Sequence, residues 1–237
     1  MEITSVQNKL IKETTKLHQK KYRDQFGHFL VEGYHLYEEA RTVGNVVQVF
    51  TTDHAIVGED VIYVNEAVLQ KLSDAKNPQG VVTVCQKVDA QEPSDQILLL
   101  DHIQDPGNLG TLLRSALAFG FTTIVLDNTV DVYNDKVLRS TQGAIFKLNF
   151  IHSSILEFME KYNWILYYGT AMTGVPIQAF STMPPFGIIL GNEGAGVNEH
   201  ILRKTTKNIT IPMIQTESLN VGVAGSIIMY ELQKKLS

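Results

Sequence analysis

Three segments of this 237-residue chain combine polar side chains with turn residues in patterns that could serve chemistry. The first is "DHIQDPGNLGTLLRSA", which follows the apolar run "ILLL" and carries Asn108 and Arg114. Free N–H groups at a helix N-terminus and a guanidinium can together hold an anion or a hydroxyl group. The segment therefore indicates a ligand-binding loop, although a plain turn beside a solvated arginine fits the same residues.

The second segment, "GIILGNEGAGVNEH", places Glu193 inside a glycine-rich loop. Three glycines within six residues let a backbone approach a ligand closely or adopt positive φ angles. The loop lacks the G-x-G-x-x-G pattern of dinucleotide sites, and Glu193 would repel a pyrophosphate. A nicotinamide cofactor is thus disfavoured, and a purely structural turn remains the alternative.

The third segment, "IPMIQTESLNVGVAGSIIMYE", puts Ser218 and Asn220 before a helix rich in small residues. Such side chains often do no more than cap free N–H groups. The small residues permit close helix packing or a nearby ligand. Ser218 does not lie in G-x-S-x-G, so a serine hydrolase is not indicated.

The elements between these segments predict an α/β domain. Apolar strands are expected at 97–101, 122–126, 164–168, 186–190 and 209–211, and helices at 109–119, 154–162, 197–205 and 219–235, with a further helical stretch in "NDKVLRSTQGAIFKL". Strands that are apolar throughout are typical of a parallel sheet covered on both faces. The three polar loops would then meet at one edge of that sheet. The run from Asp105 to Asn108 predicts a type II turn.

The first 90 residues predict a smaller α/β domain. A basic helix at 9–23 and an acidic helix ended by Gly44 precede strands at 46–52, 61–64 and 80–88, with another helix before the last strand. The segment 89–95 has no periodicity and is the expected linker. The predicted domains are therefore 1–90 and 96–237.

The overall composition is that of an ordinary globular protein, 44% hydrophobic and 19% charged, with a net charge of −5. No apolar run approaches the roughly 18–20 residues of a membrane span, and the N-terminus does not resemble a signal peptide. The single cysteine, Cys85, suits a reducing, cytoplasmic setting. No Cys/His cluster has metal-ligand spacing, so no metal site is expected.

The positive charge of the chain is concentrated near its N-terminus. A local basic field can attract a polyanion even on an acidic protein. The alternative is an amphipathic helix that exposes its charges to water. The candidate contacts to such a polyanion are Lys9, Lys12, Lys16, Lys20, Lys21 and Arg23.

Taken together, the three segments resemble, in order and spacing, the motifs of the SpoU/TrmH family of RNA ribose 2′-O-methyltransferases in the SPOUT superfamily. The resemblance covers roughly residues 97–235. The run "FLVEGYHLYEEA" gives the first domain a weaker likeness to the family's substrate-binding domain, which is related to ribosomal protein L30e. One departure is Lys9, where the family leads us to expect a proline.

The resemblance implies a fold and a site. It implies a parallel-sheet SPOUT domain whose C-terminal segment forms a trefoil knot, preceded by the smaller L30e-like α/β domain, and it implies a homodimer. The implied catalytic residues are Arg114, Asn108, Glu193, Ser218 and Asn220. The implied contacts to S-adenosylmethionine are Leu190, Gly191, Ile211, Met213, Leu219 and Asn220. Whether Arg114 would act as a general base or as a clamp is left open.

The function that follows is S-adenosylmethionine-dependent 2′-O-methylation of a ribose in structured RNA, with 23S rRNA favoured because of the additional N-terminal domain. One alternative is a tRNA ribose methyltransferase. Another is a non-catalytic RNA-binding assembly factor on the same fold. The presence of all five implied catalytic residues favours the enzyme.

Overall fold

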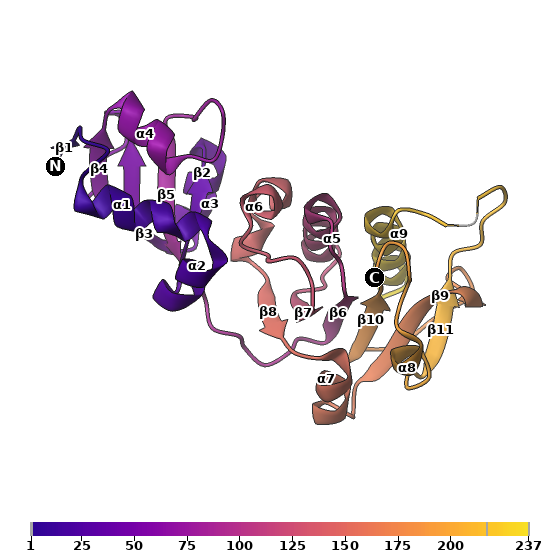
Figure 1. The fold of residues 1–237 in the computed structure, drawn as a ribbon. Helices are drawn as coiled ribbons and strands as arrows, with labels where there is room; N and C mark the ends of the chain where they lie inside the picture. The colour runs from indigo at the N-terminus through magenta and orange to yellow at the C-terminus, as the bar shows by residue number, and fades with distance from the viewer. Residues whose placement is uncertain (1, 217, 237) are drawn as a thin grey trace. The chain divides into compact units, whose positions relative to one another are not determined.

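The computed structural model describes residues 2–216 and 218–236 and divides the chain into two compact units. Unit 1 comprises residues up to Val88 together with Asp131–Phe146, and unit 2 comprises Asp89–Val130 and the chain from Lys147 onward (Figure 1). The predicted domains were contiguous, whereas here sixteen residues from the middle of the chain, 131–146, pack with the N-terminal part. None of the described helices is long and apolar enough to cross a membrane.

Unit 1 is built on a five-stranded mixed sheet with the order β1-β4-β3-β5-β2. Its strands are β1 (Glu2–Ile3), β2 (His28–Glu32), β3 (Val46–Thr51), β4 (Val61–Val64) and β5 (Val81–Gln86). β4 runs parallel to β1 and β3, whereas β5 runs antiparallel to β2 and β3. β1 and β2 were not predicted, since β1 is very short and the apolar run of β2 leads directly into the following helix.

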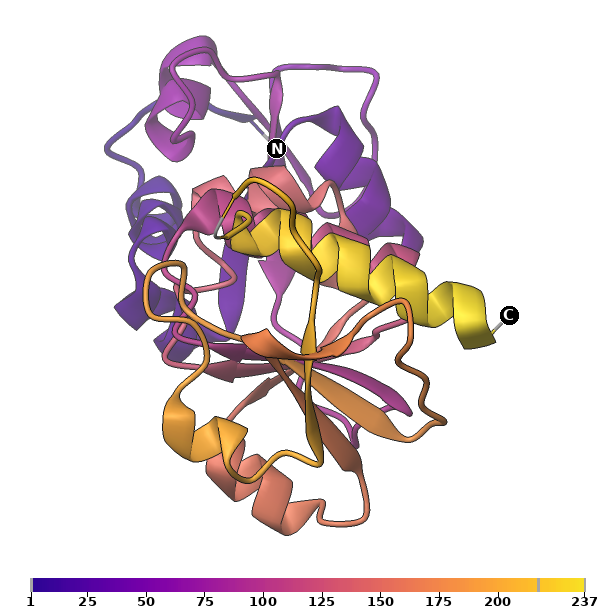
Figure 2. The same cartoon turned by 90° about the vertical axis from the view of Figure 1, so that its right-hand side faces the viewer.

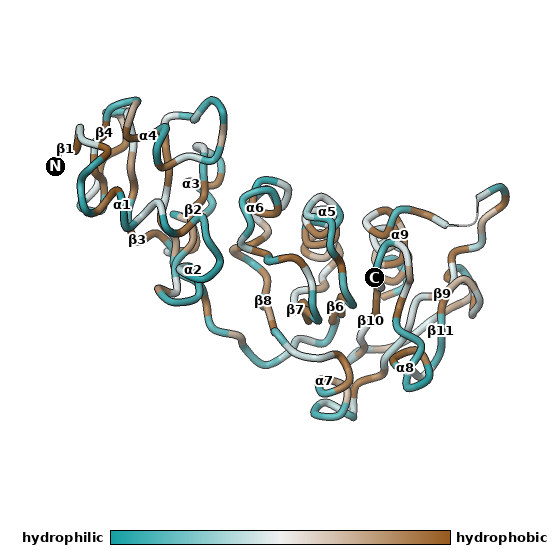
Figure 3. Tube along the Cα trace, viewed as in Figure 1, coloured by the Kyte–Doolittle hydropathy of each residue, from teal (hydrophilic) through white to brown (hydrophobic). Residues whose placement is uncertain are grey.

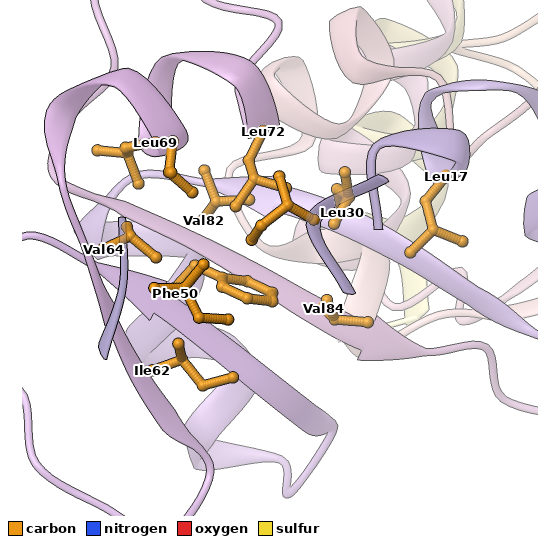
Figure 4. Packing of buried hydrophobic residues seen from close by; sticks show 12 residues of the cluster. Leu17, Leu30, Phe50, Ile62, Val64, Leu69, Leu72, Val82 and Val84 are labelled. Carbon is orange, nitrogen blue, oxygen red and sulfur yellow. The ribbon is translucent and has the colours of Figure 1, made fainter. Parts of the chain in front are cut away.

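The core of unit 1 lies between this sheet and two helices, α1 (Lys9–Thr15) and α4 (Glu66–Leu72). Ile11, Phe50, Leu69 and Leu72 are fully buried there. Figure 4 shows Leu69, Leu72 and Val82 of this cluster together with the ring of Phe50. Burial of several large apolar side chains is the main term that holds α1 and α4 in place.

The helix predicted at 9–23 is interrupted. α1 is followed by a 3₁₀ turn, Lys16–His18, and by α2 (Lys20–Phe26), with Gln19 extended between them. Arg23 explains the interruption, because its guanidinium donates hydrogen bonds of 2.9 and 2.8 Å to the carbonyls of Leu17 and His18. These carbonyls lack intrahelical partners, so a buried cation stabilises the break.

The segment 131–146, which contains α6 (Asp135–Thr141) and a 3₁₀ turn at Ala144–Phe146, is held in unit 1 by both polar and aromatic contacts. Arg23 pairs with Asp131 at 2.6 Å. Phe29 packs against Tyr133 with ring centroids 4.6 Å apart. Nδ1 of His18 lies 3.5 Å from Asp135. The remaining helix of unit 1 is α3 (Tyr34–Thr42).

Unit 2 contains a six-stranded sheet with the order β11-β9-β10-β6-β7-β8, in which every recorded pairing is parallel. Its strands are β6 (Gln96–Asp101), β7 (Thr123–Asp127), β8 (Asn149–His152), β9 (Leu166–Pro176), β10 (Phe186–Leu190) and β11 (Lys207–Thr210). Leu98, Leu99 and Leu100 are fully buried, and the strands around β6 and β7 are brown in Figure 3. The predicted α/β class and the parallel sheet are confirmed.

Helices cover both faces of this sheet, as Figure 2 shows. α9 (Val221–Leu236) and α5 (Pro106–Ala118) pack together on one face. α7 (Ile155–Lys161) and α8 (Glu199–Leu202) cover the other, with Phe158 and Ile201 against Leu99. α8 is shorter than predicted, and β8 was not predicted.

The type II turn predicted at 105–108 is wrong. Pro106 instead occupies the first turn of α5, where its missing N–H costs nothing and its φ angle suits a helix. Asp105 is the N-cap, and its carboxylate accepts a hydrogen bond of 2.8 Å from the backbone N–H of Asn108. Asn108 is thereby placed in the first turn of the helix rather than in a loop.

Candidate active site

A chain of hydrogen bonds joins the three polar segments within unit 2. The Asn108 side-chain amide donates to Glu193 Oε1 at 3.0 Å, and the Asn220 amide donates to Asn108 Oδ1 at 2.8 Å. Glu193 comes from the glycine-rich loop after β10, and Asn220 directly precedes α9. Side chains 85 and 112 positions from Asn108 thus meet at the start of α5.

This chain of hydrogen bonds from Glu193 through Asn108 to Asn220 is called the relay below. The chemistry of its groups determines which way each side-chain amide faces. An ionised carboxylate can only accept hydrogen bonds, so the NH₂ group of Asn108 must face Glu193. Its oxygen is then turned to Asn220, whose own NH₂ group donates. The oxygen of Asn220 accepts from the backbone N–H of Val223 at 3.2 Å and so caps α9. Asn220 therefore both caps a helix and belongs to the site.

Glu193 is held in its charged form. Partial burial opposes ionisation, but hydrogen bonds from the Asn108 side chain and the backbone N–H of Asp105 lower the pKa of Glu193. A carboxylate held in this way serves as a fixed acceptor and anchor for Asn108 more readily than as a proton donor.

An open cleft of about 280 Å³ lies beside the relay in unit 2. Five of the six residues implied to contact the cofactor line it, and the sixth, Asn220, lies in the relay. The five are Leu190, Gly191, Ile211, Met213 and Leu219. Glu193 and Ser218 also line the cleft, as does Asn192.

Gly191 shows why the glycine-rich loop needs its composition. A Cβ atom added there would lie 2.1 Å from the backbone carbon of Gly196 and the backbone nitrogen of Val197. No side chain fits without movement of the loop. The loop therefore presents backbone rather than side chain to this part of the cleft.

The small residues of α9 divide between two roles. Gly225 allows close packing, since a Cβ there would approach Leu112 of α5 and Leu190 of β10 to within about 2.5 Å. Ala224, by contrast, lines the cleft. The segment therefore combines close helix packing at Gly225 with a residue, Ala224, that borders the cleft.

Arg114 lies outside the relay and does not line the cleft. It is exposed on α5, and within 2–216 and 218–236 it makes no hydrogen bond or ion pair. Its helix neighbours Thr111 and Ser115 face α9, where Ser115 and Ser226 share a hydrogen bond of 2.7 Å. A guanidinium in this position is available to a substrate.

Sequence reasoning missed the groups that shape the glycine-rich loop. Asp101, buried at the end of β6, contacts His102 Nδ1 at 2.5 Å and accepts from the backbone N–H of Asn198 at 2.8 Å. Asn192 donates to the His102 carbonyl and accepts from two N–H groups of its own loop. A buried acid at a strand end was the signal that could have pointed to them. Thr170 and Thr210 of the cleft gave no such signal.

The basic residues of unit 1 fall into two groups. Arg23 is only 4% exposed and is paired with Asp131, so its predicted role as an RNA contact does not fit its position.

Lys20 pairs with Asp24 at 2.6 Å. Partial burial opposes ionisation of Asp24, yet hydrogen bonds from Lys20 and Lys87 lower its pKa to about 2. Lys9, Lys12, Lys16 and Lys21 have no such ion-pair partner among the residues described.

Comparison with known proteins shows the family of the chain. Residues 95–230 match the SpoU rRNA methylase family, and residues 8–83 match the MRM3-like substrate binding domain. The chain belongs to the SpoU rRNA methylase family. It is an RNA methyltransferase, and S-adenosylmethionine is its cofactor.

Individual relatives cover nearly the whole chain. The 23S rRNA (guanosine(2553)-2′-O)-methyltransferase RlmP of Bacillus subtilis is 36% identical and covers 98% of this chain and 99% of its own. An AdoMet-bound rRNA methyltransferase from Sinorhizobium meliloti matches with a TM-score of 0.87 and 26% identity, covering 100% and 98%. An RNA 2′-O ribose methyltransferase matches with a TM-score of 0.79 and 30% identity over all of both chains.

The residues of the cleft suit S-adenosylmethionine. Leu190, Ile209, Leu219 and Val221 give the cleft an apolar lining that would suit a purine ring, and the exposed residues 193–196 border the same cleft with polar backbone groups. Glu193 would contribute negative charge to a cleft whose cofactor carries a positive sulfonium.

Proposed function

We propose that this protein transfers a methyl group from S-adenosylmethionine to the 2′-hydroxyl of a ribose in large-subunit ribosomal RNA. The observation that carries the proposal is the hydrogen-bonded relay from Glu193 through Asn108 to Asn220, which stands beside the cleft. The names of the relatives, and the match of unit 1 to a substrate-binding domain, support rRNA over tRNA.

The chemistry requires little beyond positioning. The bound cofactor supplies an electrophilic methyl group on a sulfonium. The ribose oxygen would have to be held in line with that carbon, so that an O–C bond would form as the C–S bond breaks and the hydroxyl proton would leave to water or a nearby base. Asn108 and Asn220 are held in one orientation by the relay and can position the ribose with no rearrangement during the reaction.

We assign Arg114 the role of a clamp on the ribose hydroxyl or an adjacent phosphate. An exposed guanidinium in water keeps its proton, whereas removing a proton from the hydroxyl requires a neutral base. The planar group suits oxygen ligands of RNA. Ser218, which lines the cleft, adds a hydroxyl group from the third segment.

Arg114→Ala tests this role. We expect methyl transfer to fall by roughly 100-fold or more, because the substrate loses a charged hydrogen-bond donor. Calorimetry should show unchanged binding of S-adenosylmethionine, since Arg114 does not line the cleft. Wild-type turnover by this variant would remove Arg114 from the mechanism.

Mapping of 2′-O-methyl groups in rRNA from cells with and without the protein identifies the target. The first position to examine is the guanosine 2553 named for the Bacillus relative. Loss of one methyl group from 23S rRNA is the expected result. Loss from a tRNA instead would move the protein to the alternative substrate class, and no loss from any RNA would support a non-catalytic assembly factor.

We further propose that the enzyme is a cytoplasmic homodimer. Val223, Ile227 and Tyr230 of α9 are 47%, 36% and 51% exposed, an apolar surface that a second copy could cover. Cys85 is free and buried, in keeping with a reducing compartment. Light scattering at known protein concentration tests the dimer. The trefoil knot implied by the family resemblance stays a prediction.

A further inference from the structure

Unit 1 has an open hollow of about 330 Å³ between α1 and α4. Lys12 and Lys16 reach it from the N-terminal segment, and Lys71 reaches it from α4, some 55 residues further along the chain. The other lining residues are Val6, Gln7, Thr15 and Gln19. No carboxylate is among these residues.

The three ammonium groups are free to bind an anion. Across the described part of the chain, none of them forms an ion pair or a hydrogen bond, and the one recorded partner is the ring of Tyr22, 5.4 Å from Lys16 Nζ. This contrasts with Lys20 and Lys87, which share Asp24, and with Arg23, which is buried against Asp131.

The positions of these lysines are set by apolar packing. Ile11, Leu69 and Leu72 are fully buried in one cluster. Ile11 directly precedes Lys12 in the sequence, and Leu69 and Leu72 lie on either side of Lys71. Like charges placed side by side repel each other unless an anion lies between them. The burial that joins α1 to α4 therefore keeps these three positive charges at a hollow whose described lining residues include no carboxylate.

We propose that Lys12, Lys16 and Lys71 form a phosphate-binding notch that holds the backbone of the RNA substrate. This rests on the proposed function and extends it, since Lys71 lies outside the basic segment identified from sequence. A lysine is a point charge on a flexible stem, so the notch holds phosphates without reading bases. The notch positions the RNA, and the relay in unit 2 acts on the ribose.

The salt dependence of RNA binding tests the notch. The probe is a transcript of a large-subunit rRNA domain, and its association constant is measured over a series of KCl concentrations. Each phosphate neutralised by a lysine contributes about 0.7–0.9 to the slope of log K against log[salt]. We expect the triple variant Lys12→Gln/Lys16→Gln/Lys71→Gln to lower this slope by about 2, and Lys71→Gln alone by somewhat less than 1.

Lys20→Gln is the matched control, because it removes an exposed lysine from the same segment whose charge is already paired with Asp24. Its slope should equal that of the wild type. The proposed notch would be contradicted by an unchanged slope in the triple variant, or by an equal fall of the slope in the Lys20→Gln control. Either result would leave the proposed function standing. Failure of the wild type to bind the transcript at any salt concentration would overturn both. Circular dichroism and urea unfolding check that unit 1 of each variant is folded.

Discussion

The two regions that serve the proposed reaction hold their polar groups in opposite ways. In unit 2, Glu193, Asn108 and Asn220 are tied together by hydrogen bonds of 3.0 and 2.8 Å. In unit 1, Lys12, Lys16 and Lys71 share a hollow with no counter-charge among its lining residues. Methyl transfer depends on atoms placed to within fractions of an ångström, whereas attraction of a polyanion acts over several ångströms and tolerates flexible side chains.

The same contrast exists among the cations of the N-terminal segment. Arg23 is buried and satisfies two carbonyls and a carboxylate, so it stabilises the fold. Its neighbours Lys12 and Lys16 remain without such partners. Position in a basic run therefore does not by itself leave a cation free for a polyanion, since a buried and paired cation such as Arg23 is already occupied.

The largest effect is expected at Gly191. Gly191→Ala places a methyl group about 2 Å from the backbone of Gly196 and Val197, so the loop that borders the cleft must change shape. We expect the dissociation constant for S-adenosylmethionine to rise by roughly 100-fold or more, measured by calorimetry. Gly194→Ala is the control, because its nearest neighbour would be 3.6 Å away. Equal affinity in the two variants would show that the close approach is irrelevant to binding.

The relay is tested by Asn108→Asp, which sets a second carboxylate against Glu193. Repulsion should separate the two groups and shift the oxygen to which Asn220 donates, lowering kcat by about 10- to 100-fold, or roughly 1.4–2.7 kcal/mol. Asn198→Asp keeps an N-cap elsewhere in unit 2 and should retain full activity. If both variants have wild-type turnover, the relay does not position the substrate.

For the buried cation of unit 1, Arg23→Gln should lower the free energy of unfolding by about 3 kcal/mol, because Asp131 is left without its partner. Urea denaturation measures this value. Lys20→Gln, at an exposed pair, should change it by less than about 1 kcal/mol. Similar values for the two variants would contradict the distinction between structural and free cations.

The smallest effect concerns the pH dependence of stability. The Asp135 carboxylate, 3.5 Å from Nδ1, raises the pKa of His18 against the opposing effect of burial, while Nε2 contacts the Leu72 carbonyl at 2.9 Å. The protonated ring thus contributes stability that is fully present below the unfolded value of about 6.5 and is lost as pH rises through the higher folded pKa. His18→Gln should remove this part of the pH profile of urea unfolding. An unchanged profile would assign the dependence to other groups.

Much of unit 2 could be predicted from sequence because its signals are local. The apolar runs of β6, β7 and β10 allow little except a strand covered on both faces. The start of α5 could not be predicted in the same way, since a proline beside a glycine fits a type II turn or a first helical turn. The N-cap carboxylate of Asp105 decides between them, and its hydrogen bond to Asn108 is visible only in three dimensions.

By itself, the sequence determined the class of the protein: the order of its apolar strands, the spacing of its polar loops, and the presence of Arg114, Asn108, Glu193, Ser218 and Asn220. The tertiary structure decided which polar groups meet and which charges remain free. It joined Asn108 to Glu193 and Asn220, buried Arg23 against Asp131, and placed Lys71 beside Lys12. The physical reason is that strand and helix patterns arise from near neighbours in the chain, whereas ion pairs, burial and clefts depend on segments brought together by packing of the core.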